Sequence, residues 1–154
     1  MTNTPDFANS LFLLMEETFE AKHHGIYLDR GTSLFETLET ISSEEASIPV
    51  GGKCASLAAQ VAHVIFYIES FERYALQGDT SPRDWGYIWR TVEKVTPEQW
   101  EDYKSKLKEA YLRMDKLFHE NPTWNEDTIG GALSIVIHTA YHLGEIRQAL
   151  CTLK

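Results

Sequence analysis

Two long segments of the chain, residues 55–75 and 129–150, are apolar at helical spacing on nearly all of their sides. An α-helix turns by about 100° per residue, so a sequence with this pattern leaves the helix almost no face for water. Other helices must cover such a segment. We therefore expect both segments to lie in the interior of a helical bundle, the first of them running from about residue 54 to residue 77.

The N-terminal part of the chain predicts one long and one short helix. Apolar residues share one side of the segment 5–22, and Gly25 can end that helix because glycine readily adopts the left-handed conformation. Ser33 and Glu36 have the spacing of a capping box, which predicts the start of a short second helix.

A fourth long helix begins at Thr96-Pro97-Glu98-Gln99, which combines an N-cap threonine, a first-turn proline and a capping-box glutamine. Asn121-Pro122 closes it, and Asn125 or Thr128 can cap the helix that follows. Four long helices, one additional short helix and no convincing alternating strand predict an all-α fold, a four-helix bundle. A chain of 154 residues fits a single domain, which we place at residues 1–154.

The two remaining connections have different compositions. Residues 47–53, with Pro49 and two glycines, are typical of a loop. Residues 78–95 contain Trp85 and Trp89, and these aromatic side chains indicate packing over one end of the bundle.

The charge balance limits the classes of partner. The formal net charge is -9, from 23 acidic and 14 basic residues, so no basic surplus is present to meet phosphates. We therefore expect no nucleic-acid and no membrane partner, and no stretch approaches the ~18 apolar residues of a membrane span. The N-terminus lacks the basic region of a signal sequence. Cys54 and Cys151 form no CxxC pair and are expected as reduced thiols of a cytoplasmic protein, with Cys54 a small buried residue.

Three histidines in the two interior helices are candidate metal ligands. His138 and His142 are four residues apart, so their rings share one face of a helix. His63 lies in the other interior segment and is the best candidate for a third ligand. Three imidazoles would leave coordination positions for water or substrate, as in a catalytic site. Spacing alone leaves the ordinary interpretation open, since an HxxxH pair often arises by chance and helical histidines are usually solvent-facing or satisfied within the core.

Two further side chains are candidates for supporting roles, whereas the catalytic residue itself is not identified. Glu145 follows His142 by three residues and could be an acceptor behind a metal ligand, or a base. Tyr67 lies on the same flank as His63 and could donate a hydrogen bond into a cleft. A surface or arginine-paired carboxylate and a core-packing tyrosine are the alternative interpretations.

The sequence around these histidines resembles the DinB-like superfamily of metalloenzymes. The resemblance depends on AAQVAHVIFYIESF with His63, and on HTAYHLGEIRQAL with His138 and His142. Asp84-Trp85 and the segment VTPEQWEDYKSKLKEAYLRM extend it over about residues 7–151. It implies a four-helix bundle, usually a homodimer, in which His63, His138 and His142 bind a divalent metal ion, nickel or zinc being favoured.

The resemblance also implies a class of reaction. Some members of the superfamily are thiol S-transferases or isomerases that use a low-molecular-weight thiol. We therefore expect a metal-dependent thiol S-transferase or hydrolase that acts on a small-molecule substrate. Glu145 departs from the family pattern, in which glutamine is frequent at that position. The alternative is a non-catalytic bundle that binds a small ligand or a protein partner and keeps a vestigial or structural metal site.

Overall fold

The computed structural model describes residues 4–121 and 123–153. Within these ranges the chain forms seven α-helices and one 3-10 helix, and no strand, which confirms the predicted all-α class. The long helices are α1 (Thr4–Phe19), α4 (Leu57–Gln77), α6 (Pro97–His119) and α7 (Glu126–Leu153). The short ones are α2 (Leu34–Glu39), α3 (Ser43–Ala46), η1 (Val50–Gly52) and α5 (Tyr87–Thr91).

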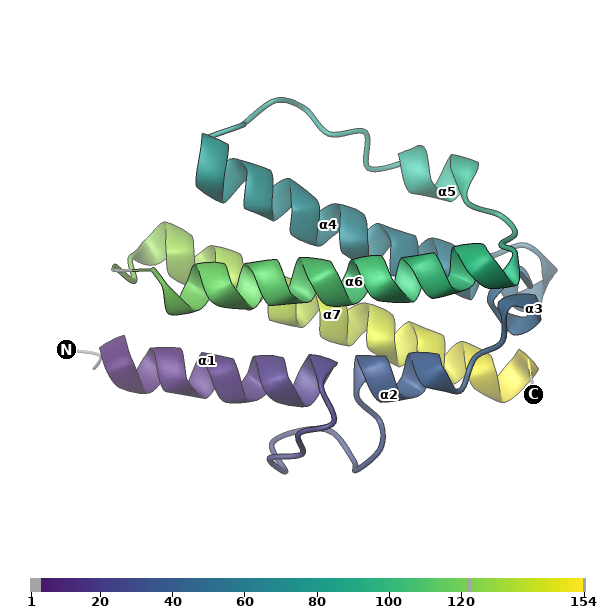
Figure 1. Ribbon diagram of the computed structural model, residues 1–154, viewed down its shortest axis with the longest axis horizontal. Helices are drawn as coiled ribbons and strands as arrows, with labels where there is room; N and C mark the ends of the chain where they lie inside the picture. The colour runs from purple at the N-terminus through teal and green to yellow at the C-terminus, as the bar shows by residue number, and fades with distance from the viewer. Residues whose placement is uncertain (1–3, 122, 154) are drawn as a thin grey trace.

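The four long helices lie side by side and share one hydrophobic core (Figure 1). Helix α4 packs against α6 and α7, and α1 packs against α7. The largest fully buried side chains include Met15, Phe19, Ile68, Trp100, Tyr111 and Ile135. Helix α7 is less covered than its sequence predicts, because Ile137 and Tyr141 remain 65% and 61% exposed.

The ends of α4 and α6 follow local signals. Helix α4 begins at Leu57, three residues later than predicted, because the Ser56 hydroxyl accepts the N–H of Ala59 at 3.2 Å and acts as the N-cap. It ends as predicted before Gly78, whose φ is +63°. The capping box of Thr96 and Gln99 at the start of α6 is also confirmed.

Helix α1 ends at Phe19 rather than at residue 22, and a buried carboxylate explains the difference. Glu17 is 2% exposed and accepts backbone N–H groups from four residues of the following loop. The distances are 2.8 Å from His24, 3.0 Å from Ile26, 2.7 Å from Tyr27 and 2.8 Å from Leu28. These bonds hold the loop against the last turn of α1, in place of further helix.

The prediction of one short helix is wrong, because four short elements are present in the described residues. The loop predicted at 47–53 contains η1, and the connection 78–95 contains α5. Helix α3 has its own capping box: the Ser42 N–H donates to the Glu45 carboxylate at 2.9 Å, and the Glu45 N–H donates to the Ser42 hydroxyl at 3.2 Å. Asn125 caps α7 by accepting the N–H of Thr128 at 3.0 Å. The predicted role of Pro122 falls outside the described residues.

The connection between α4 and α6 was predicted to cover one end of the bundle. It instead packs against the middle of α4. Trp85 packs edge-on against Phe66, with ring centroids 5.5 Å apart, and Trp89 stacks on His63 at 4.4 Å. The aromatic side chains of this connection therefore lie beside the candidate ligands. Ile88 of α5 is buried and anchors the segment.

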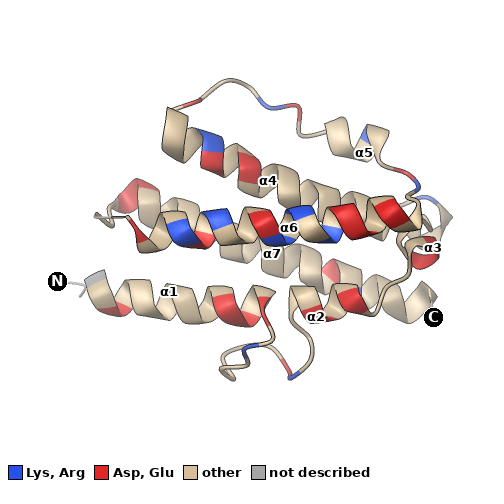
Figure 2. Ribbon diagram, in the orientation of Figure 1, with Lys and Arg blue, Asp and Glu red and all other residues tan. Residues whose placement is uncertain are grey.

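Charged residues are distributed unevenly among the long helices. Figure 2 shows red and blue positions along the length of α6, whereas most of α7 is uncharged. In the described ranges no single helix is long and apolar enough to cross a membrane. Only the bent pair Ser43–Gly52 and Leu57–Gln77, taken together, meets that criterion by length and composition.

Candidate metal centre

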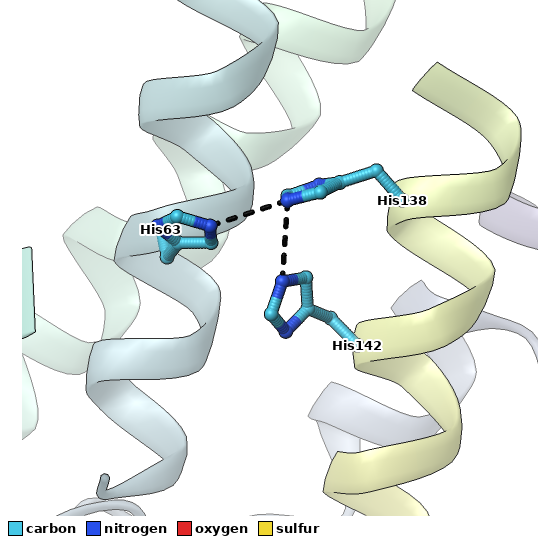
Figure 3. Close-up of side chains that lie close together, drawn as sticks. All are labelled: His63, His138 and His142. Carbon is cyan, nitrogen blue, oxygen red and sulfur yellow. Dashed lines mark hydrogen bonds between the residues drawn. The ribbon is translucent and has the colours of Figure 1, made fainter. Parts of the chain in front are cut away.

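The packing of α4 against α7 brings the three predicted histidines together. His63 comes from the first half of α4, and His138 and His142 come from successive turns of α7. Figure 3 shows the three rings pointing toward one another across the space between the two helices. His63 and His142 are 8% and 5% exposed and His138 is partly buried, so most of the cluster is covered by the fold.

The same nitrogen of each ring points toward a common point. The Nε2 atom of His138 lies 3.2 Å from Nε2 of His63 and 3.2 Å from Nε2 of His142. The ring centroids are 5.0, 5.0 and 4.5 Å apart for the three pairs. No backbone rearrangement is therefore needed to bring one nitrogen of each histidine to a shared ligand.

This spacing fits a metal ion. A tetrahedral ion with metal–nitrogen distances of about 2.05 Å separates two imidazole nitrogens by about 3.3 Å. The two Nε2 separations that involve His138, both 3.2 Å, agree with that value, and all three ligand atoms lie within 4.8 Å of one another. His63, His138 and His142 therefore form a cluster that could hold a metal ion. The identity of the ion does not follow from the donors, because imidazole suits zinc, nickel, copper and iron.

The three imidazoles are held in the neutral form that can bind a metal. Burial, followed by repulsion from His142, lowers the pKa of His63 to about 4. Burial lowers the pKa of His138 to about 3, with repulsion from His142 and His63 adding to the effect. Burial also lowers the pKa of His142, against the opposing attraction of Glu145. At neutral pH the lone pairs are therefore not occupied by protons.

Aromatic rings fix the planes of two of the histidines. Tyr67 stacks on His138 with centroids 3.7 Å apart and an interplanar angle of 11°. Trp89 stacks on His63 with an interplanar angle of 29°. Both aromatic rings restrict rotation of the imidazoles, and Trp89 does so from the connection between α4 and α6. This packing orients the Nε2 atoms before any ion binds.

Hydrogen bonds fix the orientation of the third histidine. The Nδ1 atom of His142 contacts Gln60 Oε1 through a short hydrogen bond and lies 3.1 Å from Glu145 Oε2. The Tyr141 hydroxyl donates to Glu145 Oε1 at 2.7 Å. Two oxygen acceptors at Nδ1 require a proton on that atom, so Nε2 keeps its lone pair for a metal.

The other two histidines lack this support. The Nδ1 atoms of His63 and His138 are buried and have no hydrogen-bond partner among the described residues. Metal-bound histidines usually donate from their second nitrogen to a carboxylate, carbonyl or water. The cluster therefore has the ligand spacing of a metal site, with one ring held by hydrogen bonds and two held by aromatic stacking.

Of the two residues predicted to support the histidines, Glu145 makes the expected kind of contact and Tyr67 makes a different one. Glu145 contacts His142, as expected of an acceptor behind a ligand. Tyr67 contacts His138 with its ring face, and no hydrogen bond from its hydroxyl is seen within the described chain. Sequence reasoning missed Gln60 and Trp89. Gln60 precedes His63 by three residues on the same flank of α4, so helical spacing could have indicated it, whereas no local pattern marks Trp89.

Two hollows of similar size differ in their relation to the cluster. A cavity of about 590 Å³ lies between the last turn of α4, the end of α6 and the start of α7. None of the three histidines lines it. A groove of about 560 Å³ is lined by Gln60, Tyr141 and Glu145, which surround His142. The chemistry of the site therefore adjoins the second hollow rather than the first.

The fold and the site together define an all-α protein with a buried cluster of three histidines that could hold a metal ion. No family model, curated protein or solved structure matches the chain. Any functional conclusion must therefore come from the residues of the site and from the motifs around them.

Proposed function

We propose that this protein is a divalent-metal-dependent enzyme of the DinB-like type, with His63, His138 and His142 as the metal ligands. The observation that carries the proposal is the convergence of three histidines from α4 and α7, in which Nε2 of His138 lies 3.2 Å from Nε2 of both His63 and His142 and the three ligand atoms all lie within 4.8 Å of one another. Neutral buried imidazoles have a cost unless their polar atoms find partners. A shared ion would provide one partner for all three Nε2 atoms at once.

The chain's own residues define what the site can do. Three protein ligands leave coordination positions open, as in catalytic zinc sites. A divalent ion bound there would act as a Lewis acid and lower the pKa of a coordinated water or thiol. Gln60 and Glu145 orient His142, while Trp89 and Tyr67 cover His63 and His138 and exclude water from their faces. Glu145 is also the carboxylate best placed to accept a proton beside the ligands.

The proposed reaction class is transfer of a thiol to a small electrophile, or hydrolysis of a small substrate. It is supported by the DinB-like motifs around His63, His138 and His142, and nickel or zinc is the proposed ion. A low-molecular-weight thiol would be the second substrate of the transferase. A homodimer in the cytoplasm is part of the same proposal, and the net charge of -9 supports the exclusion of nucleic acid as a partner.

A second candidate function is favoured by one observation. The unpartnered Nδ1 atoms of His63 and His138 are unusual for ligands that must be tuned for catalysis. A non-catalytic bundle that binds a small ligand or a protein partner, with the ion only joining α4 to α7, would require no such tuning. The two functions differ in whether the metal-loaded protein turns over substrate.

The first test is metal content, measured by plasma mass spectrometry on untagged protein. The wild-type protein is expected to carry close to one ion per chain, and a His138→Ala, His142→Ala double variant almost none. A matched control replaces His24 and His119, which contact Glu16 and Asp115 instead, and should keep the ion. A wild-type protein that remains empty after reconstitution with nickel, zinc, iron and manganese would overturn the metalloenzyme proposal.

The second test separates the two candidate functions. The metal-loaded protein is assayed with a panel of low-molecular-weight thiols and electrophiles, and with activated esters for hydrolysis. The enzyme predicts turnover that disappears in the His138→Ala, His142→Ala variant and persists in the His24, His119 control. Stoichiometric metal without turnover of any thiol or ester would favour the non-catalytic bundle.

A further inference from the structure

The groove beside His142 has the size of a ligand site. It lies between the start of α4, η1 and the second half of α7, and its volume is about 560 Å³. Pockets that bind organic molecules generally enclose about 300–1,000 Å³ and combine apolar walls with a few polar groups. Leu57 and Ala149 contribute apolar surface here, while Gln60, Tyr141 and Glu145 contribute polar atoms.

The charges around the groove select among ligands. Among the described residues that line it, Glu145 is the only charged one, and none is a lysine or an arginine. A ligand anion would therefore meet a carboxylate with no compensating cation, in a protein whose net charge is -9. A neutral or positively charged group would meet a favourable environment. The Tyr141 ring, which is 61% exposed, also offers its face to an apolar or cationic group.

A glycine in the wall of the groove leaves space for a ligand against the backbone of α7. Gly144 lies in the interior of α7, where glycine is less favourable than alanine. A Cβ atom added at Gly144 would meet no atom within 4 Å, so packing inside the chain does not require glycine there. At Gly131 of the same helix, an added Cβ would lie 2.2 Å from the Phe71 ring, so that glycine has an internal reason. Gly144 instead leaves the backbone of α7 open toward the groove.

The groove is joined to the histidine cluster by two side chains. Gln60 and Glu145 line the groove and also contact Nδ1 of His142. A molecule in the groove would therefore touch the residues that orient a metal ligand.

We propose that this groove binds the apolar body of a neutral or cationic organic molecule, which lies along α7 at Gly144 with its polar group at Glu145. The identification of that molecule as the substrate rests on the proposed metal-dependent function. Binding itself does not, because the groove is formed by side chains and backbone that are in place without an ion.

The test uses three probes that share one apolar body: 4-phenylbutylamine, 4-phenylbutanol and 4-phenylbutyrate. Cys54 lines the groove and is exposed, contrary to the prediction of a buried residue, so its thiol reports on occupancy. Cys151 is also exposed and serves as the internal control. Alkylation of each thiol by iodoacetamide is followed by peptide mass spectrometry. The amine and the alcohol should slow alkylation of Cys54 several-fold, whereas the carboxylate should not, and the rate at Cys151 should stay constant.

Two variants make the test specific for the groove. Gly144→Leu fills the space in front of α7 and should abolish the protection of Cys54. Gly130→Leu makes the same change at another open glycine of α7, outside the groove, and should leave protection intact. Thermal melts by circular dichroism establish that both variants are folded. Equal protection by amine and carboxylate, no protection by any probe, or protection that survives Gly144→Leu would each overturn the inference.

The metal dependence of the same assay distinguishes the two proposals. Protection of Cys54 should persist in protein stripped with a chelator. A protein that binds no metal, yet shows selective protection by the amine and the alcohol, would refute the metalloenzyme and retain the groove. A protein that binds stoichiometric metal but shows no protection of Cys54 would refute the groove and leave the metal site standing.

Discussion

Gln60 and Glu145 share one proton, the one on Nδ1 of His142. Gln60 Oε1 makes the shorter contact, and Glu145 Oε2 lies 3.1 Å away while also accepting from Tyr141. The amide and the carboxylate both accept from this N–H, and the carboxylate adds negative charge behind the ring. Acceptors of this kind fix the tautomer of a ligand and increase its basicity.

Replacing Gln60 should weaken metal binding without breaking the fold. Gln60→Met keeps the length of the side chain and removes the acceptor, so we expect the metal affinity to fall about tenfold to a hundredfold. Competition with a metal-binding dye measures the affinity directly. Gln148→Met is the matched control, because that glutamine lines the groove beyond Glu145. Equal affinities of the Gln60→Met and wild-type proteins would contradict the assignment.

Glu17 is the second residue whose surroundings decide its chemistry. Burial alone raises the pKa of its carboxyl group, but the backbone N–H groups of Leu28, Tyr27, Ile26 and His24 outweigh that effect and lower the pKa to about 2. Because the folded pKa lies below the unfolded one, Glu17 stabilises the protein at pH values above about 4.5. That contribution is lost as the pH falls from about 4.5 toward 2.

The Glu17→Gln variant should test this carboxylate. We expect a loss of about 2 kcal/mol in the free energy of unfolding at pH 7, because charge-assisted hydrogen bonds to the loop are removed. The difference from wild type should shrink as the pH is lowered through the window from about 4.5 to 2. Urea unfolding at a series of pH values measures both effects. Glu109→Gln removes the same charge from the exposed face of α6, and a similar loss in that control would contradict the proposed role.

Among individual residues, the sequence identifies those whose partners lie within a turn or two of the same helix. His142 lies one turn after His138 and Glu145 one turn after His142 on a single helix, so their proximity follows from helical geometry. The meeting of His63 with that pair required the packing of α4 on α7, and the motif resemblance indicated it. Glu17 and Trp89 could not be found, because each acts on a partner that only the tertiary fold brings near.

Two neighbouring glycines of α7, Gly130 and Gly131, differ in how closely α4 approaches them. An added Cβ at Gly131 would lie 2.2 Å from the Phe71 ring of α4, so α4 and α7 approach closely at this point. At Gly130 the same atom would meet no neighbour within 4 Å. The close approach lies two turns before His138 on the same helix, and it helps to set the distance between the two ligand-bearing helices.

Alanine at these two positions should have opposite effects. Gly131→Ala forces the Phe71 ring to move and should cost about 1–2 kcal/mol of stability. Gly130→Ala meets no obstacle and should add about 0.5–1 kcal/mol, because alanine favours the helix more than glycine does. Urea unfolding of both variants beside wild type measures the pair. Stabilisation by both substitutions would show that α4 and α7 are not in close contact here.

The ends of the helices were predicted correctly where the residues that stop or start the helix lie within one turn of that end. The capping box at Thr96 and the glycine at 78 lie at the observed helix ends, because each signal acts within one turn. The end of α1 was predicted too late, because Glu17 binds a loop that lies seven or more residues further along the chain. The short helices α3 and α5 were missed, since segments of four and five residues carry too little periodicity to be recognised.

On the scale of the whole molecule, a metal bound by all three histidines would join α4 to α7 and so stabilise the entire fold. A ligand that binds only the folded state adds about 2.7 kcal/mol when its free concentration is a hundred times its dissociation constant. For a chain of this length that corresponds to a rise of about 5–10 °C in Tm. We therefore expect chelation to lower Tm by a similar amount in wild type.

Differential scanning calorimetry with and without chelator measures this shift, and re-addition of the ion should reverse it. The His138→Ala, His142→Ala variant should show no response to chelator, whereas the His24, His119 control should respond as wild type does. An equal response in the double-histidine variant would locate the stabilising ion elsewhere.

The segment that covers His63 is held to α4 by apolar and aromatic contacts, whereas its ion pairs are internal. Arg83 pairs with Asp79 at 2.8 Å, and Arg90 pairs with Asp84, so its ion pairs close within the segment itself. The candidate ligands are on α4 and α7, whereas Trp85 and Trp89 above them are on this connection. The histidines and the two tryptophans beside them are thus encoded in separate stretches of sequence. An exchange of residues 79–95 alone would therefore remove the ring that stacks on His63 and leave the three histidines in their places on α4 and α7.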